Sequence, residues 1–367
     1  MRIAQVAPLY ERVPPVLYGG TERVVSYLTE ALVAQGHQVT LFASGDSLTA
    51  ARLRSPCARA LRLDPACRDP LAPHVRMLGD VYRHAQEFDI IHCHTDYLGL
   101  PLAETVRTPT VITLHGRLDI PDVWPLYLDY PEVPLISISD AQREPMPHAQ
   151  WLGTVHHGLP RDLYQPGDTV GDYLLFLGRI SPEKRPDAAI RIARLAGVPL
   201  KIAAKIDAAD RAYWERQILP LLEQGGLVEF LGEVDDSQKR VLLAGARALL
   251  FPIDWPEPFG LVMIEALACG TPVIARRRGS VPEILVDGVT GFVCETDEEM
   301  AAAVHRLHAL DRRRCRAEFE ARFTAEVMAR RYVALFTQVI ERRRARQRPL
   351  FAVSRAGRLA DSAPATA

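Results

Sequence analysis

Short apolar runs bounded by turn residues alternate with helical patterns along most of this chain. Runs at 3–7 and 39–43 enclose a stretch at 24–35 in which apolar residues recur at spacings of three and four, and Gly36 follows as an end signal. Because such spacing indicates a helix with one buried face, the order is strand, helix, strand. This rhythm is typical of β-α-β units with a parallel sheet, and it predicts an α/β fold.

The pattern occurs in two series. Five apolar runs precede a stretch rich in Pro, Gly and Asp at 158–168, and five more follow it. The runs are 3–7, 39–43, 90–92, 110–114 and 135–138, then 173–177, 200–204, 228–231, 248–252 and 272–275. At 367 residues the chain exceeds what one hydrophobic core usually holds. We therefore expect two doubly wound Rossmann-like domains facing across a cleft, at 1–160 and 161–324.

The chain after residue 297 has a helical pattern that ends in a long stretch at about 325–346. We expect a helix there that could cross back onto the first domain. The rest, 347–367, is small and polar, and we expect it to be disordered. The arginine-rich run 342–348 could touch anionic lipid in a weak peripheral contact, although a solvated helix end is the favoured interpretation.

Charge and cysteine usage limit the classes of partner. The net charge is −1, so no global positive field favours nucleic acid or an anionic membrane, and small molecules are the expected partners. Six cysteines without a C-x-x-C pair fit reduced thiols and a cytoplasmic location. No uninterrupted apolar segment approaches the roughly 18 residues of a membrane span, and the first residues do not resemble a signal peptide. Oligomeric state is left open.

The richest candidate loop follows the run 248–252, at the carboxyl end of a predicted strand, where open parallel sheets bind ligands. The pattern predicts a helix from about Phe259, with Pro258 in its first turn and Gly270 as its stop. The helix start would expose backbone N–H groups without local partners. A phosphate or a sugar hydroxyl is a natural acceptor for them. These groups belong to Phe259, Gly260 and Leu261.

Two carboxylates flank this helix start. Glu257 precedes it and Glu265 lies about two turns further on, so they can serve different parts of one extended ligand, such as the vicinal hydroxyls of a sugar and a ribose. Alternatively, Glu257 favours the helix dipole and Glu265 is an exposed residue. Because the neighbours of Glu265 are apolar, a carboxylate there would need a partner.

Four segments carry a resemblance to a known family: YGGTERVVSYLTEAL, LGRISPEKRPDAAI, PEPFGLVMIEALACGTPVIA and GSVPEILVDGVTGF. In this order they resemble glycosyltransferase family 4, retaining enzymes of the two-domain GT-B fold, over nearly the whole chain to about residue 340. The spacing of Glu257 and Glu265 is similar to the family's E-x7-E signature. The resemblance implies that Glu257 holds a donor-sugar hydroxyl beside the anomeric carbon, that Glu265 binds the nucleotide ribose, and that no metal is essential.

The segment GRISPEKRP follows the run 173–177, and two of its three cations are candidate site residues. Arg179 and Lys184 would face the cleft and could neutralise a diphosphate. Alternatively they are surface charges that pair with Glu183 and Asp187. The resemblance assigns both cations to the diphosphate. Lys205 stands where many relatives carry glycine, and it is either a third donor contact or a solvated strand end.

The first domain offers a glycine pair and several histidines. Gly19 and Gly20 precede the first helix, where glycines let backbone N–H groups approach a phosphate, and their position is similar to the family's donor loop. The resemblance places His115 near the donor sugar, whereas Arg117 beside it serves either the acceptor or the surface. His92 and His94 would lie on one strand face, but two ligands make a poor metal site.

Ser280 and Glu283 have the spacing of a capping box, with Pro282 in the first turn of the following helix. We interpret this motif as structural rather than functional.

The function implied is transfer of a hexose from a UDP-glucose-type or GDP-mannose-type donor, with retention, to an unidentified acceptor. The acceptor could be a lipid, a glycan intermediate or a small metabolite such as a pterin. Glu257 and His115 are the predicted catalytic residues, and no cofactor is expected. The alternatives are a GT-B-fold nucleotide-sugar epimerase and a non-catalytic nucleotide-sugar-binding or carbohydrate-binding protein. A dehydrogenase is disfavoured because the G-x-G-x-x-G fingerprint is absent.

Overall fold

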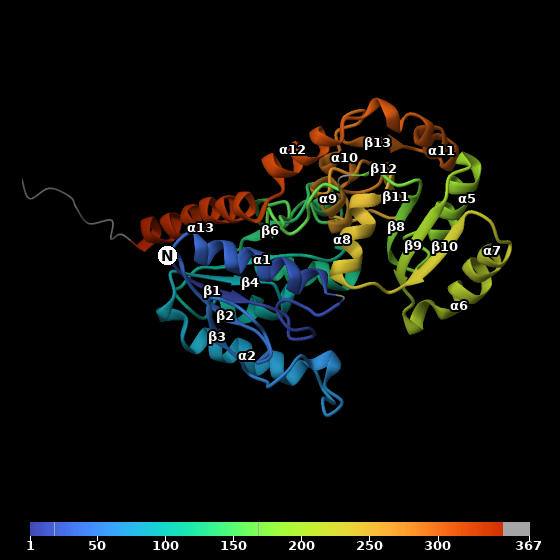
Figure 1. Ribbon diagram of the computed structural model, residues 1–367. Coiled ribbons are helices and arrows are strands. Elements are labelled where there is room, and N and C mark those ends of the chain that lie inside the picture. Colours follow the sequence, from blue (N-terminus) through green and yellow to red (C-terminus); the bar gives the residue numbers. More distant parts are fainter. Residues whose placement is uncertain (18, 168, 348–367) are drawn as a thin grey trace, which may run out of the picture.

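The computed structural model describes residues 1–17, 19–167 and 169–347. Residues 348–367 of the predicted disordered tail, including the last arginine of the run 342–348, lie outside the described residues, whereas Gln347, the first residue of that predicted tail, is the last residue of a helix. Figure 1 shows two lobes, each built on one sheet with helices on its faces. Among the described residues, no helix combines the length and the apolar character that crossing a membrane requires.

The first sheet is fully parallel, with strand order β3-β2-β1-β4-β5-β6-β7. Its strands are β1 (Arg2–Val6), β2 (Gln38–Phe42), β3 (Arg52–Arg54), β4 (Ile90–Cys93), β5 (Thr110–Thr113), β6 (Leu135–Ser137) and β7 (Trp151–Thr154). The five predicted runs all form strands, but β3 and β7 were not predicted. Both lie at sheet edges and are incompletely buried, so neither has a continuous apolar run.

The second sheet is also parallel, with order β10-β9-β8-β11-β12-β13. Its strands are β8 (Leu174–Arg179), β9 (Leu200–Lys205), β10 (Val228–Gly232), β11 (Ala248–Phe251), β12 (Val273–Arg276) and β13 (Gly291–Cys294). The prediction missed only β13, whose four residues begin with a glycine. A Cβ on Gly291 would lie 1.8 Å from the carbonyl oxygen of Val273, so this edge strand needs glycine to pair closely.

Helices cover both sheets. They are α1 (Gly20–Ala34), α2 (Leu71–Arg83), α3 (Leu100–Ala103), α4 (Trp124–Asp129), α5 (Pro186–Ala196), α6 (Arg211–Tyr213), α7 (Leu219–Glu223), α8 (Asp236–Gly245), α9 (Leu261–Ala268), α10 (Val281–Ile284), α11 (Asp297–His305), α12 (Arg312–Arg322) and α13 (Ala325–Gln347). The first helix starts at Gly20, four residues before the predicted start, because its polar first turn hides the apolar period.

The helix α13 returns to the first domain, as predicted, and lies alongside α1 in Figure 1. Its Tyr332 and Phe336 are fully buried, and both rings pack against His92 of β4, with centroid distances of 4.8 and 5.1 Å. Just before α13, Thr324 forms a parallel bridge with Leu159, at the start of the predicted linker 158–168. The two chain crossings between the domains therefore lie side by side.

The order of the strands indicates at which edge of each sheet a ligand is expected to bind. Each sheet reverses direction of winding once, between β1 and β4 in the first sheet and between β8 and β11 in the second. Open parallel sheets bind ligands at the carboxyl ends of strands at such a switch point. The loops that follow these four strands carry most of the predicted site residues.

Candidate functional site

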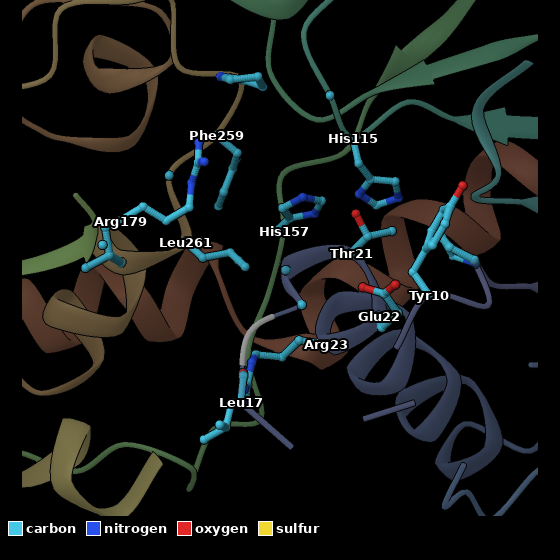
Figure 2. A pocket seen from close by; sticks show the side chains of 18 of the residues that line it. Tyr10, Leu17, Thr21, Glu22, Arg23, His115, His157, Arg179, Phe259 and Leu261 are labelled. Carbon is cyan, nitrogen blue, oxygen red and sulfur yellow. The ribbon is translucent and has the colours of Figure 1, made fainter. Parts of the chain in front are cut away.

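A cleft of about 730 Å³ lies between the two domains and is lined by residues of both. Figure 2 shows His115 and His157 on one side of this pocket, Arg179, Phe259 and Leu261 on another, and the start of α1 below them. All predicted donor and catalytic residues line it. They are Gly19, Gly20, His115, Arg179, Lys184, Lys205, Glu257, Phe259, Gly260, Leu261 and Glu265.

The start of α9 lies two residues later than predicted. The helix begins at Leu261, so Pro258 precedes its first turn instead of occupying it, and the prediction of a start at Phe259 is wrong. Gly260 adopts a left-handed conformation, with φ of 76°, and a Cβ there would meet the Met263 side chain at 2.9 Å. The chain therefore turns into the helix at a residue that must be glycine. Among the described residues, no side chain caps this start.

The starts of α1 and α9 meet across the cleft. Gly19 precedes α1 with φ of 149°, and a Cβ on it would lie 2.8 Å from Pro15. A Cβ on Gly20 would lie 3.7 Å from the side chain of Leu261, so a larger residue at position 20 would fill the gap between the domains. Two helix N-termini, each with positive dipole character, therefore face the same space, which suits an anion.

Glu257 is buried and hydrogen-bonded within the cleft. Its carboxylate pairs with Lys184, and it accepts a hydrogen bond of 3.0 Å from the Trp255 indole. Its backbone is held by the next loop, since Ser280 N–H donates to its carbonyl at 3.0 Å and a Cβ on Gly279 would lie 2.4 Å from its backbone nitrogen. The structure thus joins Glu257 and Lys184 directly, although they are 73 residues apart.

The Ser280–Glu283 motif is not the capping box that its spacing indicates. Ser280 makes no side-chain cap and instead donates to the carbonyl of Phe259 at 2.8 Å. The Glu283 carboxylate crosses to the first domain, where it accepts hydrogen bonds from the backbone N–H groups of Asp140 and Ala141 at 2.8 and 2.7 Å. The motif therefore supports the cleft and connects the domains.

Glu265 is buried and finds the partners that its apolar surroundings require. Its Oε1 atom accepts from the Tyr164 hydroxyl at 3.0 Å and from Lys239 Nζ at 2.8 Å. Lys239 also lies 3.5 Å from Asp236, which forms an ion pair of 2.7 Å with Arg23 of α1. The sequence analysis missed these partners, because they lie 26 and 101 residues from Glu265 and have no distinctive local pattern.

Arg179 and Lys205 stand at adjacent strand ends. Arg179 pairs with Glu183 at 3.0 Å and lies 3.7 Å from both Asp207 and Asp210. Lys205 pairs with Asp207 at 2.9 Å. The alternative of pairing with Glu183 therefore holds for Arg179, whereas Lys184 pairs with Glu257.

The first-domain side of the cleft is built from imidazoles. His94 Nε2 lies 2.9 Å from Gln5 Oε1, and its Nδ1 lies 2.8 Å from Nε2 of His115. His115 stacks on His157, with ring centroids 5.3 Å apart, and His157 meets Phe259 edge-on at 4.7 Å. Burial lowers the pKa of His115 to about 3 and holds the pKa values of His94 and His157 well below the ordinary value, so all three rings are neutral at pH 7.

His92 does not line the cleft, and its side chain packs in the protein interior. Its Nε2 lies 2.7 Å from the Thr113 hydroxyl, which in turn lies 3.2 Å from the Tyr332 hydroxyl of α13. Within the part of the chain that the structure describes, no group of three or more His, Cys, Asp or Glu side chains has the arrangement of a metal site. Arg117 forms an exposed ion pair with Asp119 and does not line the cleft.

Comparison with known protein families finds a match for each of the two domains. The family model described as Glycosyltransferase Family 4 matches residues 18–144, and the model described as Glycosyl transferases group 1 matches residues 168–323. The D-inositol 3-phosphate glycosyltransferase of Mycobacterium avium (strain 104) is 30% identical over 241 residues, which are 56% of this chain and 57% of that relative. The chain thus spans about half the length of the curated relatives it matches.

Solved structures share the fold over nearly the whole chain. Sucrose-phosphate synthase from Thermosynechococcus elongatus has a TM-score of 0.72 at 21% identity and covers 93% of this chain and 100% of its own. HepE from Anabaena, in complex with UDP and glucose, has a TM-score of 0.69 at 19% identity and covers 92% and 99%. AviGT4, a glycosyltransferase involved in avilamycin A biosynthesis, has a TM-score of 0.69 at 22% identity and covers 93% and 98%.

Glycosyltransferase models match both halves, and the two parallel sheets form the same GT-B architecture as these solved structures. The chain belongs to the family 4 type of glycosyltransferases.

Proposed function

We propose that this protein transfers a hexose from a nucleoside diphosphate sugar to a hydroxyl or other nucleophile with retention of the anomeric configuration, without a cofactor or an essential metal. One observation carries the proposal. The carboxylates Glu257 and Glu265 and the cation Lys184 surround the uncapped start of α9 within a single cleft between the domains. This combination suits a ligand with a diphosphate between two polyhydroxy groups.

The chemical demand is electrostatic. Departure of the nucleotide leaves negative charge on a phosphate and positive character on the sugar ring. Cations and N–H donors that already point at the phosphate therefore lower the barrier most. Lys184 and Arg179, with the N–H groups at the start of α9, would bind the diphosphate. Glu257 would hold a sugar hydroxyl, and Glu265 would bind the ribose. The helix start of α1 at Gly19 and Gly20 adds further N–H groups from the opposite side.

The sugar end of the donor would lie against the first domain. His115 lines the cleft there and is neutral, so it can hydrogen-bond a sugar hydroxyl without bringing a charge next to the positive ring. The acceptor, whose identity the proposal leaves open, would enter on this side. The donor is of the UDP-glucose or GDP-mannose type, and a cytoplasmic location is supported by six free thiols.

The test is an assay of nucleotide release. Purified protein is incubated with UDP-glucose, GDP-mannose or UDP-N-acetylglucosamine, with and without candidate acceptors. We expect release from one donor, and we expect Glu257→Ala to reduce it by about 100-fold or more, because a contact made in the transition state is lost. Glu229→Ala is the matched control, because Glu229 is an exposed carboxylate of β10 outside the cleft.

Four outcomes would contradict the proposal. No release from any donor would do so, as would release that Glu257→Ala leaves unchanged. Donor binding without turnover would indicate a nucleotide-sugar-binding protein. If NMR shows that the donor sugar is converted to another sugar without nucleotide release, the protein is an epimerase.

A further inference from the structure

The carboxylate of Glu265 is held on one side only. Both of its hydrogen bonds, from the Tyr164 hydroxyl and from Lys239 Nζ, reach the same oxygen, Oε1. Among the described residues, no hydrogen bond or ion pair joins the other oxygen, Oε2. Because Glu265 lines the cleft, Oε2 retains its capacity to accept hydrogen bonds from a ligand bound there.

Tyr164 is a rigid donor. Its side chain is 1% exposed, and burial, followed by the charge of Glu265, raises its pKa well above the ordinary value, so the hydroxyl keeps its proton. Its backbone carbonyl accepts a hydrogen bond of 2.6 Å from Arg316 of α12. The same guanidinium also donates to the carbonyl of Ala268 at the end of α9, at 2.8 Å. Arg316 therefore fixes the spacing between Tyr164 and the helix that carries Glu265.

Lys239 is held from its other side. Its ammonium lies 3.5 Å from Asp236, and Asp236 forms an ion pair of 2.7 Å with Arg23 of the first domain. The charges alternate along Arg23, Asp236, Lys239 and Glu265. The Lys239 side chain is only 17% exposed, so the side chains around it restrict its movement away from Oε1.

A carboxylate with one oxygen fixed by two donors cannot rotate without losing both hydrogen bonds. Its second oxygen then points in one direction and can accept from the hydroxyls of a vicinal diol. On the basis of the proposed function, we infer that Tyr164 and Lys239 are positioning residues that hold Glu265 for the ribose and so set the preference for a ribonucleotide over its deoxy counterpart.

Nucleotide binding measured by calorimetry tests this inference without turnover. The probes are UDP and 2′-deoxy-UDP, or GDP and 2′-deoxy-GDP if the protein prefers guanosine. The readout is the ratio of the two Kd values, in Tyr164→Phe, Lys239→Met and the unmodified protein. The unmodified protein should prefer the ribonucleotide, because a site built to bind a hydroxyl leaves a buried acceptor unpaired when the hydroxyl is missing.

We expect each variant to lower this preference by about threefold or more, which corresponds to one weakened hydrogen bond. The affinity for the deoxynucleotide should change less than the affinity for the ribonucleotide, because only the hydroxyl contact depends on Glu265. Lys239→Arg keeps a donor and a positive charge, so it should retain more of the preference than Lys239→Met.

Matched controls lie outside the cleft. Tyr173 is another buried tyrosine, whose hydroxyl donates to the carbonyl of Leu242 at 2.8 Å, and Lys201 lies 3.7 Å from Glu229. Tyr173→Phe and Lys201→Met should leave the preference unchanged. Equal weakening of both nucleotides in the Tyr164 and Lys239 variants, or an unchanged preference, would overturn the inference while leaving the proposed function intact. If neither UDP nor GDP binds the unmodified protein, the proposed function fails, and this inference fails with it.

Discussion

The two sides of the cleft are made of different chemistry. We call the residues Arg179, Lys184, Lys239, Glu257 and Glu265 of the second domain the charged wall, because each takes part in an ion pair. We call His94, His115 and His157 of the first domain the histidine wall, because burial keeps these rings neutral at pH 7. One wall carries three cations and two carboxylates, and the other carries only dipoles.

This difference assigns different tasks to the walls. A diphosphate can exchange partners with the acids that now hold Lys184 and Arg179, so the charged wall can respond to an anionic ligand without leaving cations unpaired in its absence. Neutral rings give shape and hydrogen bonds without attracting a second anion. A donor with a charged diphosphate and a neutral sugar therefore fits the cleft in one orientation, with its diphosphate at the charged wall and its sugar at the histidine wall.

The largest effect should follow removal of a cation from the charged wall. Lys184→Met deletes a positive charge at the proposed diphosphate position and leaves the buried carboxylate of Glu257 without its cation. We expect kcat/KM for the donor to fall by about 100- to 1000-fold, the size typical of a lost transition-state charge contact. Steady-state kinetics of nucleotide release measure this.

The control for that experiment is Lys201→Met, which removes a lysine outside the cleft and should leave kcat/KM within about twofold, because exposed ion pairs contribute little. A Lys184 variant that retains more than a third of the activity would show that the charged wall does not stabilise the leaving group.

The histidine wall makes a prediction about pH and stability. The folded-state pKa values of His94, His115 and His157 are lowered from 6.5, chiefly by burial. Below pH 6.5 the unfolded chain therefore binds protons that the folded protein does not, and the free energy of unfolding falls as pH falls. Each ring should contribute a loss of about 1 kcal/mol between pH 7.5 and pH 5.5, and the full stability is present above pH 6.5.

Urea unfolding at pH 7.5, 6.5 and 5.5 measures this, with His157→Phe as the partner variant. The phenylalanine keeps an aromatic ring against Phe259 and cannot bind a proton, so the variant should lose about 1 kcal/mol less on acidification than the unmodified protein. Identical losses in both proteins would mean that His157 is protonated in the folded state, and the histidine wall would then be charged.

The sequence anticipates the charged wall far better than the histidine wall. Glu257, Gly260 and Glu265 lie in one contiguous segment whose spacing encodes a helix start, and Arg179 and Lys184 lie in another. His94, His115 and His157 come from three different loops, and their mutual contacts arise only when β4 and β5 pair and the chain leaves the first sheet. Short-range spacing carries no information about such contacts.

The errors have a similar cause. The strands β3 and β7 at the edges of the first sheet were missed because neither of them has a continuous apolar run. The Ser280–Glu283 spacing indicates a local capping box, but the backbone N–H groups of Asp140 and Ala141 offer Glu283 a better pair of donors in the other domain. In that case a tertiary contact outweighs a local preference.

The smallest effect is expected at the edge of the charged wall. Lys205 stands at the end of β9, and it pairs with Asp207 at 2.9 Å with 32% of its side chain exposed. An ion pair with this exposure contributes about 0.2 to 1 kcal/mol. Lys205→Ala should therefore change the donor Kd and kcat by no more than about threefold. A loss of tenfold or more in donor affinity would instead place Lys205 on the diphosphate, so that three cations, Arg179, Lys184 and Lys205, would act on the leaving group.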